Sequence, residues 1–358
     1  MFRRWIVLVM VSVALMILSG TMLAQDDCGL TVEDCAFLAE FDAVMGAVQS
    51  AAFNVETEFG VDYLMLPEPV TLRAVLNGAY MLQETDETDS LLRLINGVNA
   101  DVNVIIDLAD LRDLLPYYTQ SSLLTFDTRL VEGVGYLNLD KVAAMDYSGS
   151  TPTGWYGVDL IAFYRALLDV AGFRNNPPEL VERTPIIVAL EEINTLQRLE
   201  DSELNGQSMA VFDTGIIFAD VLADSDQKDR LIEGLLLTLR EQFGGFYSEQ
   251  ELAEIAESYA DLFTGTTFHF TRTIGLDDHY LHRAEISFVY TPNSTAVFDL
   301  LSTPDPLGFS ALYFDLCFDF ALNLTRFNTM SLTTVPEDAV IVPMDELLPG
   351  YDAGGAGF

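Results

Sequence analysis

The sharpest hydrophobic pattern of the chain lies between residues 309 and 322. Apolar side chains occupy every second position from 312 to 322, while Asp315 and Asp319 fall on the positions between them. A period of two is that of a β-strand, whose successive side chains point to opposite faces. One apolar and one largely polar face are typical of an antiparallel sheet with a solvated side. We therefore predict a strand over 309–322.

Similar patterns predict most of the other strands. They cover residues 53–59, 70–82, 100–108, 123–131, 134–139, 208–218, 267–274, 284–290 and 326–334. The run 70–82 is apolar at both sets of alternating positions, which indicates a strand covered on both faces. The segment 185–199 is compatible with either a helix or a strand.

Helical periodicity appears in four places. Apolar residues recur at helical spacing over 32–52, with Thr31 as a candidate N-cap. A second helix should run to about Val170, and a third should cover 227–243. A fourth should begin after Ser248, because Ser248 and Glu251 have the spacing of a capping box.

The order of these elements favours one α+β domain. Helix, strands, helices and strands follow one another with hairpins rather than regular βαβ units, which predicts one large antiparallel sheet with helices on one side. We expect this domain to span 25–349, followed by a Gly-rich flexible tail over 350–358. Because this is long for one core, a division into two domains near Asn175–Pro178 is the alternative.

The N-terminus has the features of a secretory signal peptide over residues 1–24. Arg3 and Arg4 precede an apolar run over 5–18, and Ala24 offers a cleavage position. The run is shorter than the about 20 residues that a membrane span needs, although a retained signal anchor is the alternative. Because Cys28 does not directly follow small residues, we expect no lipid anchor. The chain should therefore act outside the cytoplasm, secreted or associated with the cell envelope.

The net charge limits the classes of partner, and the cysteines indicate a disulfide. The chain has 55 acidic and 17 basic residues, so its surface should repel nucleic acid and anionic membranes. An exported protein can form disulfides, and Cys28 and Cys35 are close enough to pair at the start of the first helix. Cys317 lies in the alternating strand, where a buried thiol acts as a small hydrophobic group.

All three histidines fall within residues 267–290. Gly275 and Asp277-Asp278 lie between two alternating runs, so we predict a β-hairpin. His279 and His282 are three apart and would point to opposite faces of a strand, which argues against a shared metal. The chain also lacks the nucleophile-elbow, phosphate-loop, dinucleotide and H-E-x-x-H motifs. We therefore expect no enzyme activity, metal or cofactor, with a carboxylate-dependent hydrolase as the less favoured alternative because a carboxylate pair cannot be singled out among so many acids.

Several short motifs, taken in order, resemble the LolA-like lipoprotein-carrier superfamily and its LppX/LprG-type lipid-carrier lipoproteins. They are Val48-Gln49-Ser50-Ala51-Ala52-Phe53, Gly154-Trp155-Tyr156-Gly157-Val158-Asp159-Leu160, Leu204-Asn205-Gly206-Gln207, Thr273-Ile274-Gly275-Leu276-Asp277-Asp278, Phe327-Asn328 and Val335-Pro336-Glu337-Asp338-Ala339. The resemblance implies a curved antiparallel sheet, an open half-barrel, with helices on its concave face and an apolar cavity between them. It implies no catalytic residues.

Together these features predict an exported, non-catalytic protein that binds a lipid or another apolar molecule, with membrane or envelope proteins as further partners. A cavity for such a ligand should be lined by Phe268, Phe270, Phe288, Tyr290, Leu312, Phe314, Leu316, Phe318 and Phe320. The alternative is an envelope interaction or structural module in which the same side chains fill a solid core.

Overall fold

The computed structural model describes residues 28–62, 68–85, 90–110, 122–144, 151–170, 184–297 and 314–347. The chain forms two compact units. Unit 1 comprises Met1–Gly46, Glu58–Thr71 and Val181–Ala321, and unit 2 comprises Ala47–Thr57, Leu72–Leu180 and Leu322–Phe358. The predicted signal peptide, the Gly-rich tail and the segment 175–178 lie outside the described residues.

Within the described part of the chain, the strands form a 13-stranded sheet in the order β13-β6-β5-β4-β3-β2-β1-β12-β11-β10-β9-β7, with β8 paired to β9. The sheet is open, because its end strands β13 and β7 are not paired to each other. Its described ladders are antiparallel, apart from the short parallel pair of β13 with β6. The predicted α+β fold with a large, open, mostly antiparallel sheet is confirmed.

The strands have the following bounds: β1 Ser50–Asp62, β2 Val70–Leu82, β3 Val98–Asp107, β4 Leu123–Val131, β5 Val134–Asn138, β6 Trp155–Asp159, β7 Thr195–Arg198, β8 Ser202–Leu204, β9 Gln207–Ile217, β10 Thr267–Gly275, β11 Leu281–Tyr290, β12 Asp315–Thr325 and β13 Val340–Ile341. The helices are α2 Val32–Gly46, α3 Ser90–Gly97, α4 Asp140–Ala143, α5 Leu160–Val170, α6 Pro185–Ile193, α7 Phe218–Ala223, α8 Ser225–Phe243, α9 Glu249–Leu262 and α11 Met344–Leu347. The ambiguous segment 185–199 is thus a helix and a strand, joined at Asn194.

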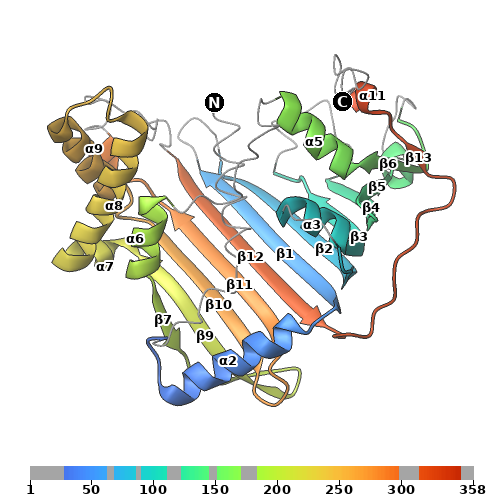
Figure 1. Cartoon of the computed structure of the whole chain (residues 1–358), viewed down its shortest axis with the longest axis horizontal. Helices are drawn as coiled ribbons and strands as arrows, with labels where there is room; N and C mark the ends of the chain where they lie inside the picture. The colour runs from blue at the N-terminus through green and yellow to red at the C-terminus, as the bar shows by residue number, and fades with distance from the viewer. Residues whose placement is uncertain are drawn as a thin grey trace. The chain divides into compact units, whose positions relative to one another are not determined.

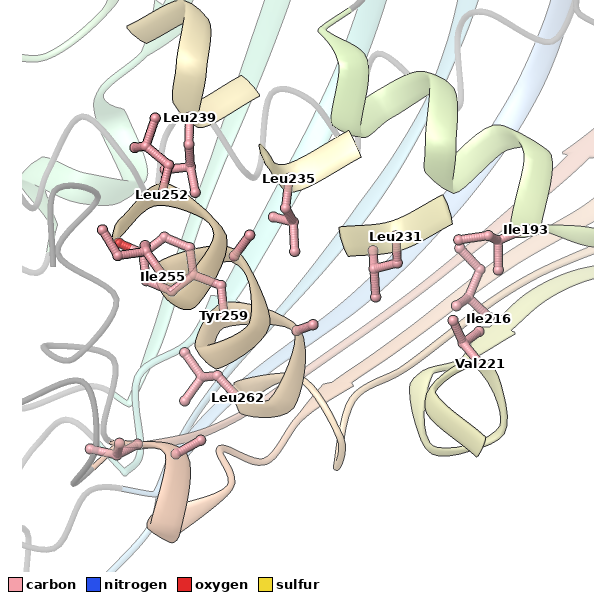
Figure 2. Close-up of a cluster of buried hydrophobic side chains, with 14 residues drawn as sticks. Ile193, Ile216, Val221, Leu231, Leu235, Leu239, Leu252, Ile255, Tyr259 and Leu262 are labelled. Atoms are coloured by element: carbon pink, nitrogen blue, oxygen red, sulfur yellow. The ribbon is translucent and has the colours of Figure 1, made fainter. Parts of the chain in front are cut away.

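The larger core of unit 1 lies where α6, α7, α8 and α9 pack together and onto one end of β9. Figure 2 shows its buried side chains, which include Leu231 and Leu239 of α8, Tyr259 of α9 and Ile216 of β9. Burial of each large apolar side chain contributes about 1.5–3 kcal/mol to this packing. The core therefore fixes these helices to the sheet.

The ends of α8 and α9 are set by their capping residues. The Asp224 side chain accepts hydrogen bonds from the backbone N–H groups of Asp226 and Gln227 at the start of α8. At the start of α9, the Ser248 hydroxyl accepts from the Glu251 N–H, and the Glu251 carboxylate accepts from the Ser248 N–H. The capping box predicted at Ser248 is confirmed. These contacts satisfy backbone donors that have no partner within the helix.

The first helix, α2, packs separately in unit 1. Thr31 caps it, accepting a hydrogen bond from the Asp34 N–H, and the disulfide between Cys28 and Cys35 joins its first turn to the preceding residues. Its buried Leu38 and Phe41 belong to a second core with Ala210, Phe212 and Ile274. In Figure 1, α2 lies across the ends of β9, β10 and β11.

The predicted C-terminal limit of this helix at Ala52 is wrong. The helix ends at Gly46, and Ser50 and Ala51 are buried in β1. Residues 47–52 would suit a helix locally, but pairing within the sheet overrides such weak local preferences.

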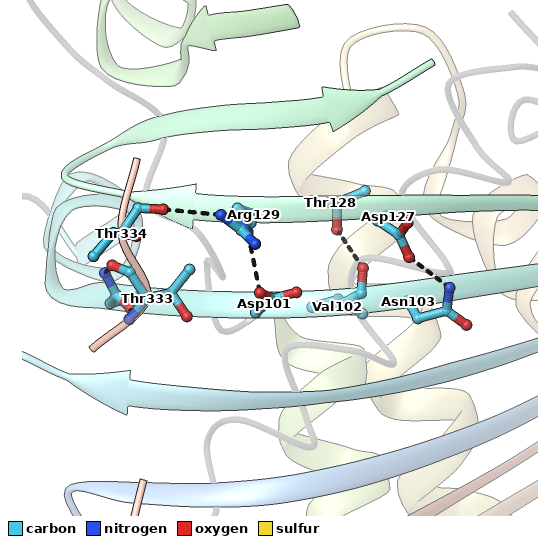
Figure 3. Close-up of polar contacts among 9 residues, drawn as sticks. Asp101, Val102, Asn103, Asp127, Thr128, Arg129, Thr333 and Thr334 are labelled. Carbon is cyan, nitrogen blue, oxygen red and sulfur yellow. Dashed lines mark hydrogen bonds and ion pairs between the residues drawn. The ribbon is translucent and has the colours of Figure 1, made fainter. Parts of the chain in front are cut away.

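Unit 2 has a polar ladder on one face of its strands. The Asn323 amide donates to Asn54, the Asn54 amide donates to Asn77, and Asn77 lies directly opposite Asn103. Asn103 donates in turn to Asp127, which also binds Lys141. On the same two strands Arg129 binds Asp101, as Figure 3 shows beside the Asn103–Asp127 bond. This face is therefore tied across its strands by side chains rather than by an apolar core.

The strand predicted over 326–334 is wrong. Arg326 and Asn328 have positive φ angles of 55°, so the chain turns where a strand would have to be straight. The following residues form hydrogen bonds with side chains instead of pairing with a neighbouring strand. Thr333 exchanges two hydrogen bonds with the Asn99 side chain, and the Thr334 carbonyl accepts from Arg129 (Figure 3). Thr333 and Thr334 thus bind to β3 and β4 through the side chains of Asn99 and Arg129 rather than as a further strand.

The strand predicted over 309–322 is β12, which runs from Asp315 to Thr325. Residues 309–313 lie outside the described residues. Within the described residues the strand begins at Asp315, and it continues to Thr325, beyond the predicted end at Leu322.

Candidate functional site

The three histidines do not form a common site. His269 Nδ1 lies 3.1 Å from Asp213 Oδ2, His279 Nε2 lies 3.2 Å from Glu40 Oε2, and His282 Nε2 lies 3.0 Å from Asp278 Oδ2. Each imidazole is thus held by a different carboxylate. In the part of the chain that the structure describes, no group of three His, Cys, Asp or Glu side chains could hold a metal ion. The predicted hairpin over 267–290 is confirmed, because β10 and β11 pair antiparallel.

The aromatic residues predicted on this hairpin share one face of unit 1. Phe268 lies opposite Phe288 on one side and Ile216 on the other, and Phe270 lies opposite Ile286 and Thr214. Residues directly opposite in neighbouring strands point to the same side of a sheet. Phe268, Phe270, Ile286, Phe288 and Tyr290 therefore form a continuous surface, which we call the apolar face of unit 1.

Three further predicted residues alternate along β12. Leu316, Phe318 and Phe320 are partly buried, whereas Asp315 and Asp319 between them are exposed. The ring of Phe314, just before this strand, lies 6.5 Å from that of Tyr290. Tyr290 also contacts Phe263 and is buried, which raises the pKa of its hydroxyl. Leu312, the remaining predicted lining residue, lies outside the described residues.

The apolar face of unit 1 is covered at both ends but incompletely between them. At one end, Ile216 belongs to the core formed with α6, α8 and α9. At the other end, Phe212 and Ile274 belong to the core beneath α2. Phe268, Phe270 and Phe288 lie between these cores, belong to neither, and stay partly buried. The structure thus brings the predicted aromatic residues together on a surface that α2, α6, α8 and α9, among the helices of the described ranges, do not finish burying. Their contact with a ligand stays a prediction.

Sequence reasoning missed a charged residue on this face. Arg272 occupies the position between Phe270 and Ile274, so the alternation of β10 places it with the apolar side chains. Its side chain is buried, and its guanidinium carbon lies 5.7 Å from the centre of the Phe270 ring. Burial lowers the pKa of the Arg272 guanidinium, and the charge of Asp42 on α2 opposes that effect. The same alternation that identified Phe268 and Phe270 could have identified Arg272.

Asp213 was also missed, and it lies among the polar partners of β10. It accepts hydrogen bonds from the Thr271 hydroxyl at 2.8 Å and lies beside His269. Asp213 is only 6% exposed, so these partners satisfy a polar group whose burial alone would be unfavourable. Its position between alternating apolar residues of β9 gave no sign of this role. The contacts of Asp213 with Thr271 and His269 thus join β9 to β10 by side chains.

Among the described residues, no helix combines the length and the apolar character that crossing a membrane requires.

The fold comparisons return lipoproteins and a LolA-superfamily protein, while no family model and no curated protein sequence matches the chain. Lipoprotein LppX from Mycobacterium tuberculosis is 10% identical, with a TM-score of 0.31, over 84% of this chain and 97% of LppX. LprF from Mycobacterium bovis is 10% identical, with a TM-score of 0.31, over 86% and 98% of the two chains. A LolA-superfamily protein from Nitrosomonas europaea is 8% identical, with a TM-score of 0.16, over 84% and 94%.

Proposed function

We propose that this protein is an exported, non-catalytic binding protein that holds a lipid or another apolar molecule on the apolar face of unit 1. The observation that carries the proposal is the incomplete burial of Phe268, Phe270 and Phe288 between two well-packed cores. A protein that needed this surface only for stability would be expected to bury it as fully as Ile216 and Ile274.

The chemistry of the face suits an acyl chain. Its side chains are aromatic or aliphatic, and ligand pockets are typically lined in this way with a few polar groups to orient the ligand. Transfer of each methylene from water to such a surface is worth about 0.8 kcal/mol. Several methylenes of an acyl chain that contacts Phe268 and Phe270 would therefore contribute several kcal/mol to binding without any hydrogen bond or ion pair.

The proposal includes export, supported by the signal-like segment 1–24 and by the disulfide of Cys28 with Cys35. Disulfides form and persist mainly in oxidising compartments outside the cytoplasm. The high acidity of the chain gives an outer surface that repels anionic membranes, so a membrane would have to be reached through a partner protein or a local apolar patch.

The binding proposal can be tested with a fluorescent fatty acid and purified, delipidated protein. We expect saturable uptake, weakened by Phe270→Ala on the apolar face. Val289→Ala is the matched control, because Val289 neighbours Phe288 in β11 but is 38% exposed and alternates to the other face. No uptake by the unaltered, folded protein would refute a carrier of acyl chains. An equal loss in both variants would refute this location of the site.

A further inference from the structure

Arg272 has few of the partners that a buried arginine normally has. It lies in the middle of unit 1, opposite Phe212 of β9 and Ala284 of β11, and it is only 8% exposed. Its Nε is buried without a hydrogen-bond partner. In the described ranges, no hydrogen bond or ion pair of the guanidinium group is found. A charged group in such a position is unfavourable unless it is paired and hydrogen-bonded.

Arg198 provides an internal comparison. It lies opposite the same Phe212 from the other side, in β7, and its guanidinium carbon is 5.0 Å from the centre of that ring. Unlike Arg272, it forms ion pairs with Asp34 and Asp201. It also donates to the carbonyl groups of Leu199 and Val211, each at 3.2 Å. Two arginines thus flank one buried ring, and only Arg198 has a full set of internal acceptors.

Asp42 is the acid that influences Arg272 electrostatically, but it does not complete the pair. It lies on α2, and burial raises the pKa of its carboxyl group while Arg272 lowers it. The two charges attract each other without approaching to hydrogen-bonding distance. An acceptor that reached Arg272 directly would therefore make contacts that Asp42 does not make.

Arg272 also lies where the apolar face begins. Phe270 and Phe268 precede it in the sequence on the same face of β10, and the backbone position of Arg272 is about 13 Å along the strand from that of Phe268. An amphiphile with its hydrocarbon part on Phe268, Phe270 and Phe288 would place its polar end near Arg272. Arginine binds carboxylates and phosphates with two parallel hydrogen bonds, which gives both charge and geometry.

We propose that Arg272 receives the anionic headgroup, a carboxylate or a phosphate monoester, of an acyl-chain ligand that lies on the apolar face of unit 1. This inference rests on the proposed function and adds the ligand class and its orientation. Asp42 should weaken binding of the headgroup, because the headgroup would be a second negative charge beside the same guanidinium group.

The test compares four probes by displacement of an apolar dye from delipidated protein. Two are a long-chain fatty acid and an alkyl phosphate monoester, and the third is the methyl ester of the same fatty acid. The fourth is inorganic phosphate or acetate, which tests a free anion without the chain. We expect both anionic amphiphiles to bind better than the ester, and the free anions not to displace the dye.

The variants separate the headgroup from the chain. Arg272→Gln should lower the preference for acid over ester by about tenfold or more, while ester binding stays nearly unchanged. Arg198→Gln is the matched control and should leave the preference unaltered. Asp42→Asn should increase affinity for the acid several-fold without affecting the ester. Far-UV circular dichroism confirms that each variant folds.

The outcomes distinguish the two proposals. If the unaltered protein binds none of the amphiphiles, the proposed function itself fails. If it binds acid and ester equally and Arg272→Gln changes neither, the headgroup role of Arg272 is overturned while the binding function stands. Should Arg272→Gln fail to fold, Asp42→Asn decides, because an unchanged acid-to-ester ratio in that variant would overturn the inference.

Discussion

Phe268 lies directly opposite Phe288 in the antiparallel ladder of β10 and β11, and both side chains remain partly buried. The other neighbour of Phe268 is Ile216, which is 7% exposed and belongs to the helical core. The sheet thus passes from a filled core to an incompletely covered aromatic pair within one strand spacing. This transition is the basis of the binding proposal.

Truncation of this pair should affect binding more than stability. Phe268→Ala together with Phe288→Ala removes a cross-strand contact that is worth about 0.2–1 kcal/mol, plus part of the burial of each ring. We expect a loss of about 2 kcal/mol in the free energy of unfolding and at least a tenfold loss of affinity for a fluorescent fatty acid. Denaturant titration and fluorescence titration measure the two effects. Full affinity in a folded double variant would contradict this position of the ligand.

Truncation of a side chain in the helical core should affect stability more than binding. Leu239 is fully buried in α8, so Leu239→Ala should lower the free energy of unfolding by about 2–5 kcal/mol. Because Leu239 lies in the core and not on the uncovered stretch, the folded fraction should still bind ligand with unaltered affinity. Phe246→Ala is the control, since Phe246 is 84% exposed and should cost almost nothing. Equal stability of both variants would show that this core is not packed as described.

The capping box of α9 gives a pH-dependent prediction. Ser248→Ala should destabilise the protein by about 1 kcal/mol near neutral pH, because the Glu251 N–H loses its acceptor. The Ser248 backbone and side chain hold the pKa of Glu251 below its usual value, so the part of the stability that comes from the Glu251 carboxylate accepting from Ser248 is present above the unfolded pKa and is lost as the pH falls through the folded pKa. The difference between variant and unaltered protein should therefore shrink in acid.

Ser258→Ala is the matched control for this capping experiment. Its hydroxyl donates to the Glu254 carbonyl within α9, where alanine is the better helix former. We expect no destabilisation from it in urea titrations at either pH. A difference for Ser248→Ala that stays constant down to acid pH would argue against the role of Glu251.

The disulfide of unit 1 should stabilise the start of α2. Cys28 and Cys35 are separated by seven positions, and closing so short a loop in the unfolded chain corresponds to about 2.5 kcal/mol. Cys28→Ser with Cys35→Ser should lower the free energy of unfolding by about that amount. Cys317→Ser is the control, because Cys317 is a free thiol in β12. Thermal unfolding with and without reductant checks the pair, and identical curves would exclude a stabilising bond.

Much of the fold could be predicted because its elements carry strong local patterns. The segments 70–82 and 123–131 are strands with the predicted bounds, and Ser248 with Glu251 begins a helix as predicted. The end of α2 and the course of the segment 326–334 could not be predicted, because they depend on contacts with residues far away in the sequence. Ser50 is drawn into the sheet, and Thr333 binds the side chain of Asn99, over 200 positions away in the sequence.

The candidate site was predicted in part for the same reason. Alternation places Phe268, Phe270 and Phe288 on one face without any knowledge of the fold. It could not show that the two helical cores stop short of these residues, because burial depends on the positions of α2, α8 and α9. It also could not show that Arg272 lacks the acceptors that Arg198 has, since those acceptors come from the loop after β7, from β9 and from α2.

Native mass spectrometry of the protein, purified gently from its own host, shows directly whether the apolar face of unit 1 holds a ligand. We expect a mass above that of the processed polypeptide, with an acyl-chain molecule released on activation and lost in the Phe268→Ala and Phe288→Ala double variant. A bare polypeptide mass, together with no uptake of added fatty acid by the same folded sample, would contradict this expectation.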